Sequence, residues 1–112
     1  MGRARTYTPR RASKTRWLQN APDFVLDVFD HPTFADRFTI ILTGKGVLTT
    51  DGTYAGTYLP YLTSDNSGGT CFGEFKAHEC TQYRYAQKHR RISWDNLPEA
   101  VKKAVIRRVT ED

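Results

Sequence analysis

The sequence predicts an α+β fold, in which a small antiparallel sheet of four or five strands carries a C-terminal helix and follows a disordered basic N-terminal arm. Short runs of β-branched and aromatic residues alternate with turn residues through the middle of the chain. A stripe of apolar residues at helical spacing lies near its end. The first 16 residues contain no large aliphatic side chain besides Met1.

The arm comprises residues 1–16, which hold six basic residues and no acidic one. The whole chain has 17 basic and 12 acidic residues, so residues 17–112 carry 11 against 12 and are close to neutral. A segment with so little apolar area cannot offset its ordering entropy, and we expect it to be disordered until it is bound. Residues 17–112 form a single α+β domain, because the chain is too short for two independent cores.

The first two strands are predicted at residues 24–29 and 37–43, where branched and aromatic side chains dominate. The sequence Asp30-His31-Pro32-Thr33 separates them as a turn. Residues 37–43 form the most apolar segment of the chain.

A hairpin is predicted next, with strands at residues 47–50 and 53–58 joined by an Asp-Gly turn. Residues 59–62 extend its second strand. Because proline has no N–H to donate, Pro60 is expected to restrict this extension to a sheet edge or a bulge.

A polar loop at residues 64–70 leads to a short strand at 71–75, whereas the pattern of residues 77–87 fits neither helix nor strand well. The closing helix is better defined, because Asn96-Leu97-Pro98-Glu99 resembles a capping box with proline in the first turn. We expect this helix to pack over the sheet. Its apolar residues recur along one face: Leu97, Val101, Ala104, Val105 and Val109.

Two groups of residues have the chemistry to bind a polyanion: the cations of the arm, and residues 83–91, where tyrosines and basic residues are interspersed. Basic side chains neutralise phosphates, and tyrosine rings stack on unpaired bases. The alternative for residues 83–91 is an edge strand or loop whose tyrosines face the core while its charges are solvated. The predicted nucleic-acid-binding residues are Arg3, Arg5, Arg10, Arg11, Lys14, Arg16, Tyr83, Arg84, Tyr85, Lys88, Arg90 and Arg91.

Metal and catalytic sites are weakly indicated. Cys71, His78, Cys80 and His89 are zinc-ligand types, but they lack the close pairs that make zinc motifs specific. Cys71, His78 and Glu79 offer a thiol, a base and an acid, yet sequence neighbours rarely converge as a catalytic triad requires. We therefore predict no metal, no cofactor and no enzymatic activity. Two cysteines do not define a disulfide framework, and whether they are bridged stays open.

Three blocks of the sequence resemble a family of small uncharacterised proteins carried by phages and plasmids. They are DRFTI at residues 36–40, FGEF at 72–75 and RISWDNLPE at 91–99, within a resemblance that spans residues 24–109. The family pairs an early DR-[FY]-T strand with a glycine-rich loop ending in GE and a closing [KR]-[RK]-I-x-[FW]-x-x-LP-x-x-V. The stretch YLPYLTSDNSGG departs from the more proline-rich loop of the family. The resemblance implies a mobile-element context and no particular chemistry.

No apolar run approaches the ~18 to 20 residues of a membrane span, and no hydrophobic stretch follows the basic N-terminus as in a signal peptide. With the resemblance, this predicts a protein in the cytoplasm of a bacterial or archaeal host, without a membrane partner.

The leading functional hypothesis is a small, non-catalytic, basic binding protein of mobile-element type that contacts nucleic acid or a nucleoprotein complex. One alternative is a protein-directed inhibitor of a host defence nuclease, as anti-CRISPR proteins are, in which the near-neutral domain docks on its target. The other is a structural component of a virion or assembly that uses the basic arm. The sequence leaves the oligomeric state open.

Overall fold

The computed structural model describes residues 5–6, 16–43, 47–48 and 58–111, and the elements among them confirm the predicted α+β class. Short 3₁₀ turns lie at Arg16–Leu18, Lys88–Arg90 and Trp94–Asn96. The strands and helices are β1 (Arg5–Thr6), β2 (Val25–Asp30), β3 (Phe38–Leu42), β4 (Val47–Leu48), β5 (Tyr58–Ser64), β6 (Thr70–Lys76), α1 (Ala77–Ala86) and α2 (Glu99–Glu111).

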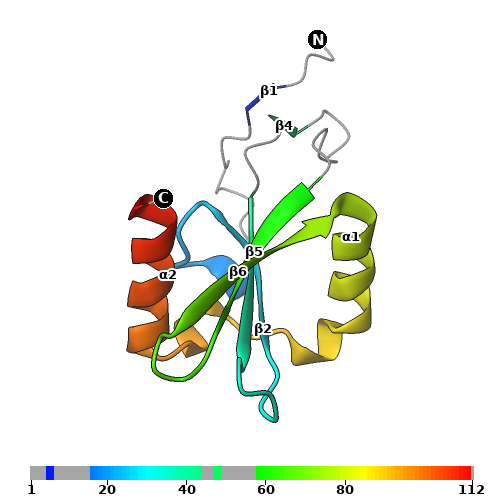
Figure 1. Ribbon diagram of the computed structural model, residues 1–112. Helices are drawn as coiled ribbons and strands as arrows, with labels where there is room; N and C mark the ends of the chain where they lie inside the picture. Colours follow the sequence, from blue (N-terminus) through cyan, green and yellow to red (C-terminus); the bar gives the residue numbers. More distant parts are fainter. Residues whose placement is uncertain (1–4, 7–15, 44–46, 49–57, 112) are drawn as a thin grey trace.

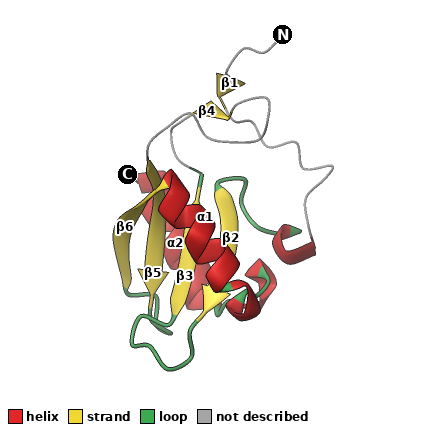
Figure 2. Ribbon diagram, turned by 90° about the vertical axis from the view of Figure 1, so that its right-hand side faces the viewer, coloured by secondary structure: helices red, strands yellow, loops and turns green. Residues whose placement is uncertain are grey.

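The main sheet is antiparallel with the strand order β2-β3-β5-β6, and a helix covers each of its faces. In Figure 1 the sheet stands between α2 and α1. Figure 2, turned by 90°, shows α1 in front of the strands and α2 behind them. We call the two sides the α2 face and the α1 face.

Strand β3 contributes to both faces, since successive side chains of a strand point to opposite sides. Phe38, Ile40 and Leu42 belong to the cluster on the α2 face, and Ile41 belongs to the cluster on the α1 face. All five residues of β3 are buried. This two-sided burial explains why the segment is a continuous apolar run instead of an alternating one.

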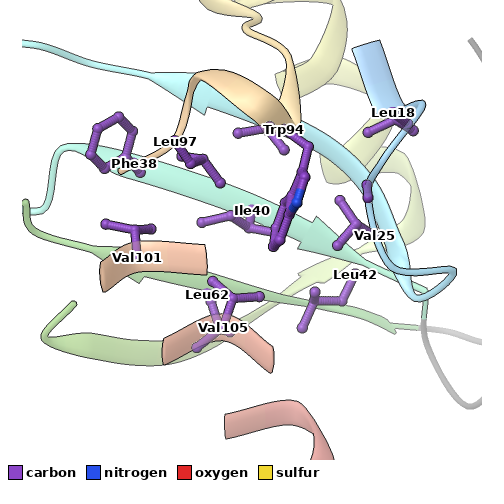
Figure 3. Close-up of a cluster of buried hydrophobic side chains, with 12 residues drawn as sticks. Leu18, Val25, Phe38, Ile40, Leu42, Leu62, Trp94, Leu97, Val101 and Val105 are labelled. Carbon is purple, nitrogen blue, oxygen red and sulfur yellow. The ribbon is translucent and has the colours of Figure 1, made fainter. Parts of the chain in front are cut away.

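The larger core lies on the α2 face, where one side of α2 packs on β2, β3 and β5 (Figure 3). Val101, Ala104 and Val105 are buried, as predicted for this helix. Full burial of each valine or leucine contributes about 1.5 to 3 kcal/mol. The helix begins at Glu99, after the 3₁₀ turn at Trp94–Asn96, and the Pro98 carbonyl accepts its first hydrogen bonds. The chain therefore does not begin the helix at the predicted Asn96 cap.

Strand β5 lies inside the sheet, so the prediction that Pro60 restricts it to an edge or a bulge is wrong. Pro60 pairs with Glu74 of β6, whereas the ladder between β3 and β5 stops at Tyr61. On the β3 side Pro60 therefore lies beyond the paired residues, and its missing N–H removes no bond from that ladder.

Helix α1 forms where the sequence pattern was ambiguous. Its first turn is held by Glu79, whose Oε1 accepts a hydrogen bond from the Lys76 N–H at 2.9 Å. Among its side chains only Cys80 is fully buried, and Tyr83 is half-buried beside it. Such a narrow apolar contact leaves little periodicity in the sequence, which explains why the helix was not predicted.

Part of the arm pairs with another segment: Arg5 and Thr6 form an antiparallel pair with Leu48 and Val47. These two residues of the predicted arm form a short strand. Most of the arm and the predicted Asp-Gly hairpin turn lie outside the described residues. No helix among the described residues is both long and apolar enough to cross a bilayer.

Candidate functional site

Five rings form a continuous series on the α1 face. The ring of Tyr61 lies 4.5 Å from that of Phe75, which lies 5.1 Å from Tyr83, measured between centroids. Tyr83 meets the edge of His31 at 6.1 Å, and His31 stacks on Phe34 at 4.9 Å with an interplanar angle of 13°. Rings from two strands, a loop and a helix thus meet at one place.

These rings surround a pocket of about 500 Å³, within the usual size of a small-ligand site. Its wall combines the five rings with four polar side chains that come from the β2–β3 loop, from β3, from β5 and from the residue after α1. The lining residues are His31, Phe34, Asp36, Thr39, Tyr61, Thr63, Phe75, Tyr83 and Gln87.

The loop between β2 and β3 holds Phe34 in an exposed position, with 60% of its surface accessible. The His31 N–H donates to the Arg37 carbonyl at 2.7 Å, and the Phe34 N–H donates to the His31 carbonyl at 2.9 Å. The Arg37 guanidinium donates two bonds to the Asp30 carboxylate, at 2.6 and 2.9 Å. The loop is closed at its base, so an exposed apolar ring is presented in a defined place.

His31 and Tyr83 share a hydrogen bond of 2.6 Å between Nε2 and Oη at the pocket wall. Burial, followed by the positive charge of Arg90, lowers the pKa of His31 below its usual value. Burial raises the pKa of the Tyr83 hydroxyl. Both groups are therefore neutral at pH 7, and their shared bond is one between uncharged partners.

Gly73 of β6 leaves room for the ring of Tyr61, its cross-strand partner. A Cβ atom at Gly73 would collide with the end of this ring. The absence of a side chain on β6 thus lets Tyr61 lie flat across the sheet, where it forms one wall of the pocket.

A buried carboxylate lies on the same face. Asp27 is only 3% exposed and accepts two bonds from Arg91, at 2.8 and 3.0 Å, and one from Arg84 at 3.0 Å. A buried carboxylate without such partners would be strongly destabilising. We therefore assign Arg84 and Arg91 to the fold, although the sequence placed them among the nucleic-acid-binding residues.

The other predicted basic residues of this segment are exposed. Lys88 and Arg90, together with His89, form a 3₁₀ turn after α1, and we call these three residues the basic ridge. Tyr85 is 72% exposed, and the Lys88 Nζ lies 4.6 Å from its ring centroid. The ridge follows directly on Gln87 of the pocket, and the charges of Arg90 and His89 act on His31.

The sequence left two alternatives for Tyr83: a ring that stacks on bases, or a ring that faces the core. The structure combines features of both, because Tyr83 is half-buried against Phe75 and Phe29 yet lines the pocket. Of the predicted arm residues, Arg16 is exposed, with its guanidinium carbon 5.2 Å from the Trp17 ring centroid. Arg5 is described as a strand residue only. Lying outside the described residues are Arg3, Arg10, Arg11 and Lys14.

The residues weighed as zinc ligands do not meet. Cys71 is exposed on β6, Cys80 is buried under α1, and both thiols are free. Burial raises the pKa of the Cys80 thiol, which makes it a poor nucleophile. Within the part of the chain that the structure describes, no three histidine, cysteine or acidic side chains gather as a metal site would need.

Phe34, Tyr61 and Phe75 were not among the site residues predicted from the sequence. The sequences of β5 and β6 held a signal for Tyr61 and Phe75. Residues two positions apart in a strand lie on the same face, so Tyr61 shares a face with the polar Thr63, and Phe75 shares a face with Gly73. Phe34 carried a weaker signal, because it is an apolar residue inside a turn segment.

The chain was also compared with protein-family models, with curated proteins and with solved structures, and nothing in these three sets matches it. The resemblance to phage and plasmid proteins stays a prediction.

Proposed function

We propose that this protein is a non-catalytic nucleic-acid-binding protein, with mobile-element context as the sequence resemblance implies. The observation that carries the proposal is the position of the basic ridge, whose exposed cations border a pocket lined by aromatic rings. The arm adds six further positive charges in the sequence.

The ridge and the pocket supply the two kinds of contact that such binding needs. Lysine and arginine neutralise phosphates and release counterions, which gives affinity without regard to sequence. Aromatic faces add stacking with bases. The remaining exposed surface of the domain is not strongly basic, because residues 17–112 are nearly neutral and two of their arginines pair with Asp27.

A salt series on oligonucleotide binding tests this function. Each phosphate contact adds about 0.7 to the log–log slope for a single strand, so the variant Lys88→Ala/Arg90→Ala should lower the slope by about 1.4. Replacing the six arm cations with glutamine in the full chain should lower it by about 4 if all six meet phosphates. Fluorescence anisotropy of a labelled oligonucleotide measures both effects.

The matched control is Lys103→Ala/Arg107→Ala, which removes two exposed cations from α2 and changes the net charge equally. Its slope should stay at the wild-type value. An equal loss in both double variants would mean that net charge alone attracts the polymer, and absence of binding at low salt would overturn the proposal.

A second candidate, a protein-directed inhibitor, is favoured by the outer edge of β6. No described strand pairs with this edge, and Phe72 on it is 42% exposed. The opposite edge of the sheet is covered, since the Ile92 N–H donates to the Val28 carbonyl at 3.0 Å. An exposed edge can accept a strand of a partner. A complex from host lysate that survives nuclease and protects the β6 amides from hydrogen exchange would favour this candidate.

A further inference from the structure

We propose that the pocket on the α1 face receives one unstacked base of a single strand whose phosphates lie on the basic ridge. This inference rests on the proposed nucleic-acid binding and deepens it, because it makes single strands the preferred ligand and assigns a place to a base. A duplex keeps its bases stacked and paired, so it can reach the ridge but cannot fill the pocket without paying to extrude a base.

An exposed aromatic ring, that of Phe34, lies beside the positive charges of the basic ridge. Phe34 is stacked on His31 yet remains 60% exposed, so part of its surface is available to a ligand. The closed loop holds this ring in one place beside the pocket, so its free surface can stack on a flat ligand. The ridge beside it favours an anionic partner, and a nucleotide combines a flat ring with a negative charge.

The pocket contains both hydrogen-bonding groups that already have a partner and groups that have none among the described residues. The Tyr83 hydroxyl is already engaged by His31 and Thr39. Within residues 16–43 and 58–111, no partner is seen for the side-chain polar atoms of Asp36, Thr63 and Gln87. They are therefore free to meet the edge of a base. A carboxylate accepts from an amino group, as acidic side chains do from cytosine, so a cytosine strand is a suitable probe.

The exposed phenylalanine of the α2 face has different surroundings from Phe34. Phe72 is also an exposed phenylalanine, but Arg108 of α2 covers its ring at 4.7 Å and also bonds to Thr70. It lines no pocket beside the ridge. This makes Phe72 a matched control for Phe34, since both changes remove one exposed phenyl ring.

The test measures binding of the full chain to a labelled oligo(dC) of about 12 nucleotides, to an abasic strand of the same length and to a duplex. Stacking of one base is worth about 1 to 3 kcal/mol by alanine substitution, so Phe34→Ala should weaken oligo(dC) binding about 5- to 150-fold. Binding of the abasic strand and of the duplex should not change. Because the phosphate contacts remain, the salt slope of Phe34→Ala should equal that of the wild type.

Phe72→Ala should bind all three probes as the wild type does, and circular dichroism should show that both variants are folded. Equal affinity of the wild type for oligo(dC) and the abasic strand would overturn the inference while leaving the proposed function intact. So would a loss in Phe34→Ala that is the same for duplex and single strand. If the wild type binds none of the three probes at low salt, the proposed function itself fails.

Discussion

The two faces of the sheet are built differently. On the α2 face, apolar side chains from β2, β3 and β5 meet one side of α2 and form a closed core (Figure 3). On the α1 face, a smaller apolar cluster around Phe29 and Ile41 is flanked by the buried Asp27 and by an open pocket. Because the same strands contribute to both faces, alternate residues along one strand have different roles.

This difference shows where the molecule retains side chains that folding does not need. The α2 face holds the larger buried apolar cluster, which is what stabilises a chain of this size. The α1 face keeps polar atoms and an exposed ring near each other. Substitutions on the α2 face should therefore lower the free energy of unfolding, whereas pocket substitutions should change binding.

The largest effect is expected from two neighbours in β5 whose side chains point to opposite faces. Leu62 is fully buried in the α2 cluster, and Leu62→Ala should lower the free energy of unfolding by about 3 kcal/mol. Thr63 lines the pocket, and Thr63→Ala should cost about 0.5 kcal/mol. Urea denaturation measures both values. Equal losses would show that the α1 face is packed as tightly as the other.

The next effect concerns the ion pairs of Asp27. Arg91→Ala removes two of its charge-assisted bonds but leaves the one from Arg84, so we expect a loss of about 2 kcal/mol. Arg90 precedes it, is exposed and belongs to the basic ridge. Arg90→Ala should change stability by less than about 0.5 kcal/mol and should weaken oligonucleotide binding. The reverse pattern would mean that Arg91 belongs to the ridge and Arg90 to the fold.

A smaller effect is expected where the β5–β6 loop closes the α2 face. Gly68 has a φ of +94°, and a Cβ there would lie 2.9 Å from the Ala100 carbonyl oxygen of α2. Gly68→Ala should cost about 1.5 kcal/mol or more, since the strained backbone and the contact both oppose it. Asn66→Ala in the same loop is the control, because Asn66 is exposed. Thermal unfolding that is unchanged in Gly68→Ala would indicate that the loop does not rest on α2.

The smallest effect is a pH dependence on the α1 face. The folded pKa of His31 is lowered, so the unfolded chain takes up this proton first and stability decreases as the pH falls below about 6.5. Besides burial, the groups that act on the ring are the guanidinium of Arg90, the carboxylate of Asp30 and the side chain of His89. His31→Gln should lose less stability than the wild type between about pH 8 and pH 5. Parallel curves for the two proteins would contradict this assignment.

The strands and α2 were predictable because their signals are local. Branched and aromatic runs mark β2, β3 and β6, and the spacing of Leu97, Val101 and Val105 marks the apolar side of α2. Helix α1 was not predictable in this way, since it buries little besides Cys80. Strand β5 can lie inside the sheet because its pairing with β3 ends at Tyr61, before Pro60. No local sequence pattern indicates where that pairing ends.

The candidate site was predictable only in part. Local composition identified Tyr85, Lys88 and Arg90, which are exposed. It also selected Arg91, whose partner Asp27 lies 64 positions away in the sequence. The pocket forms only when the β2–β3 loop, the three strands β3, β5 and β6, and α1 are assembled, so no stretch of sequence contains it.

Gly73 does not line the pocket, but its missing side chain affects the shape of the pocket through Tyr61. Any larger residue at that position would displace the phenol of Tyr61, which lines the cavity, and would so change the shape of the pocket. One small residue on β6 thus sets the position of a ring that shapes the cavity on the same face of the sheet.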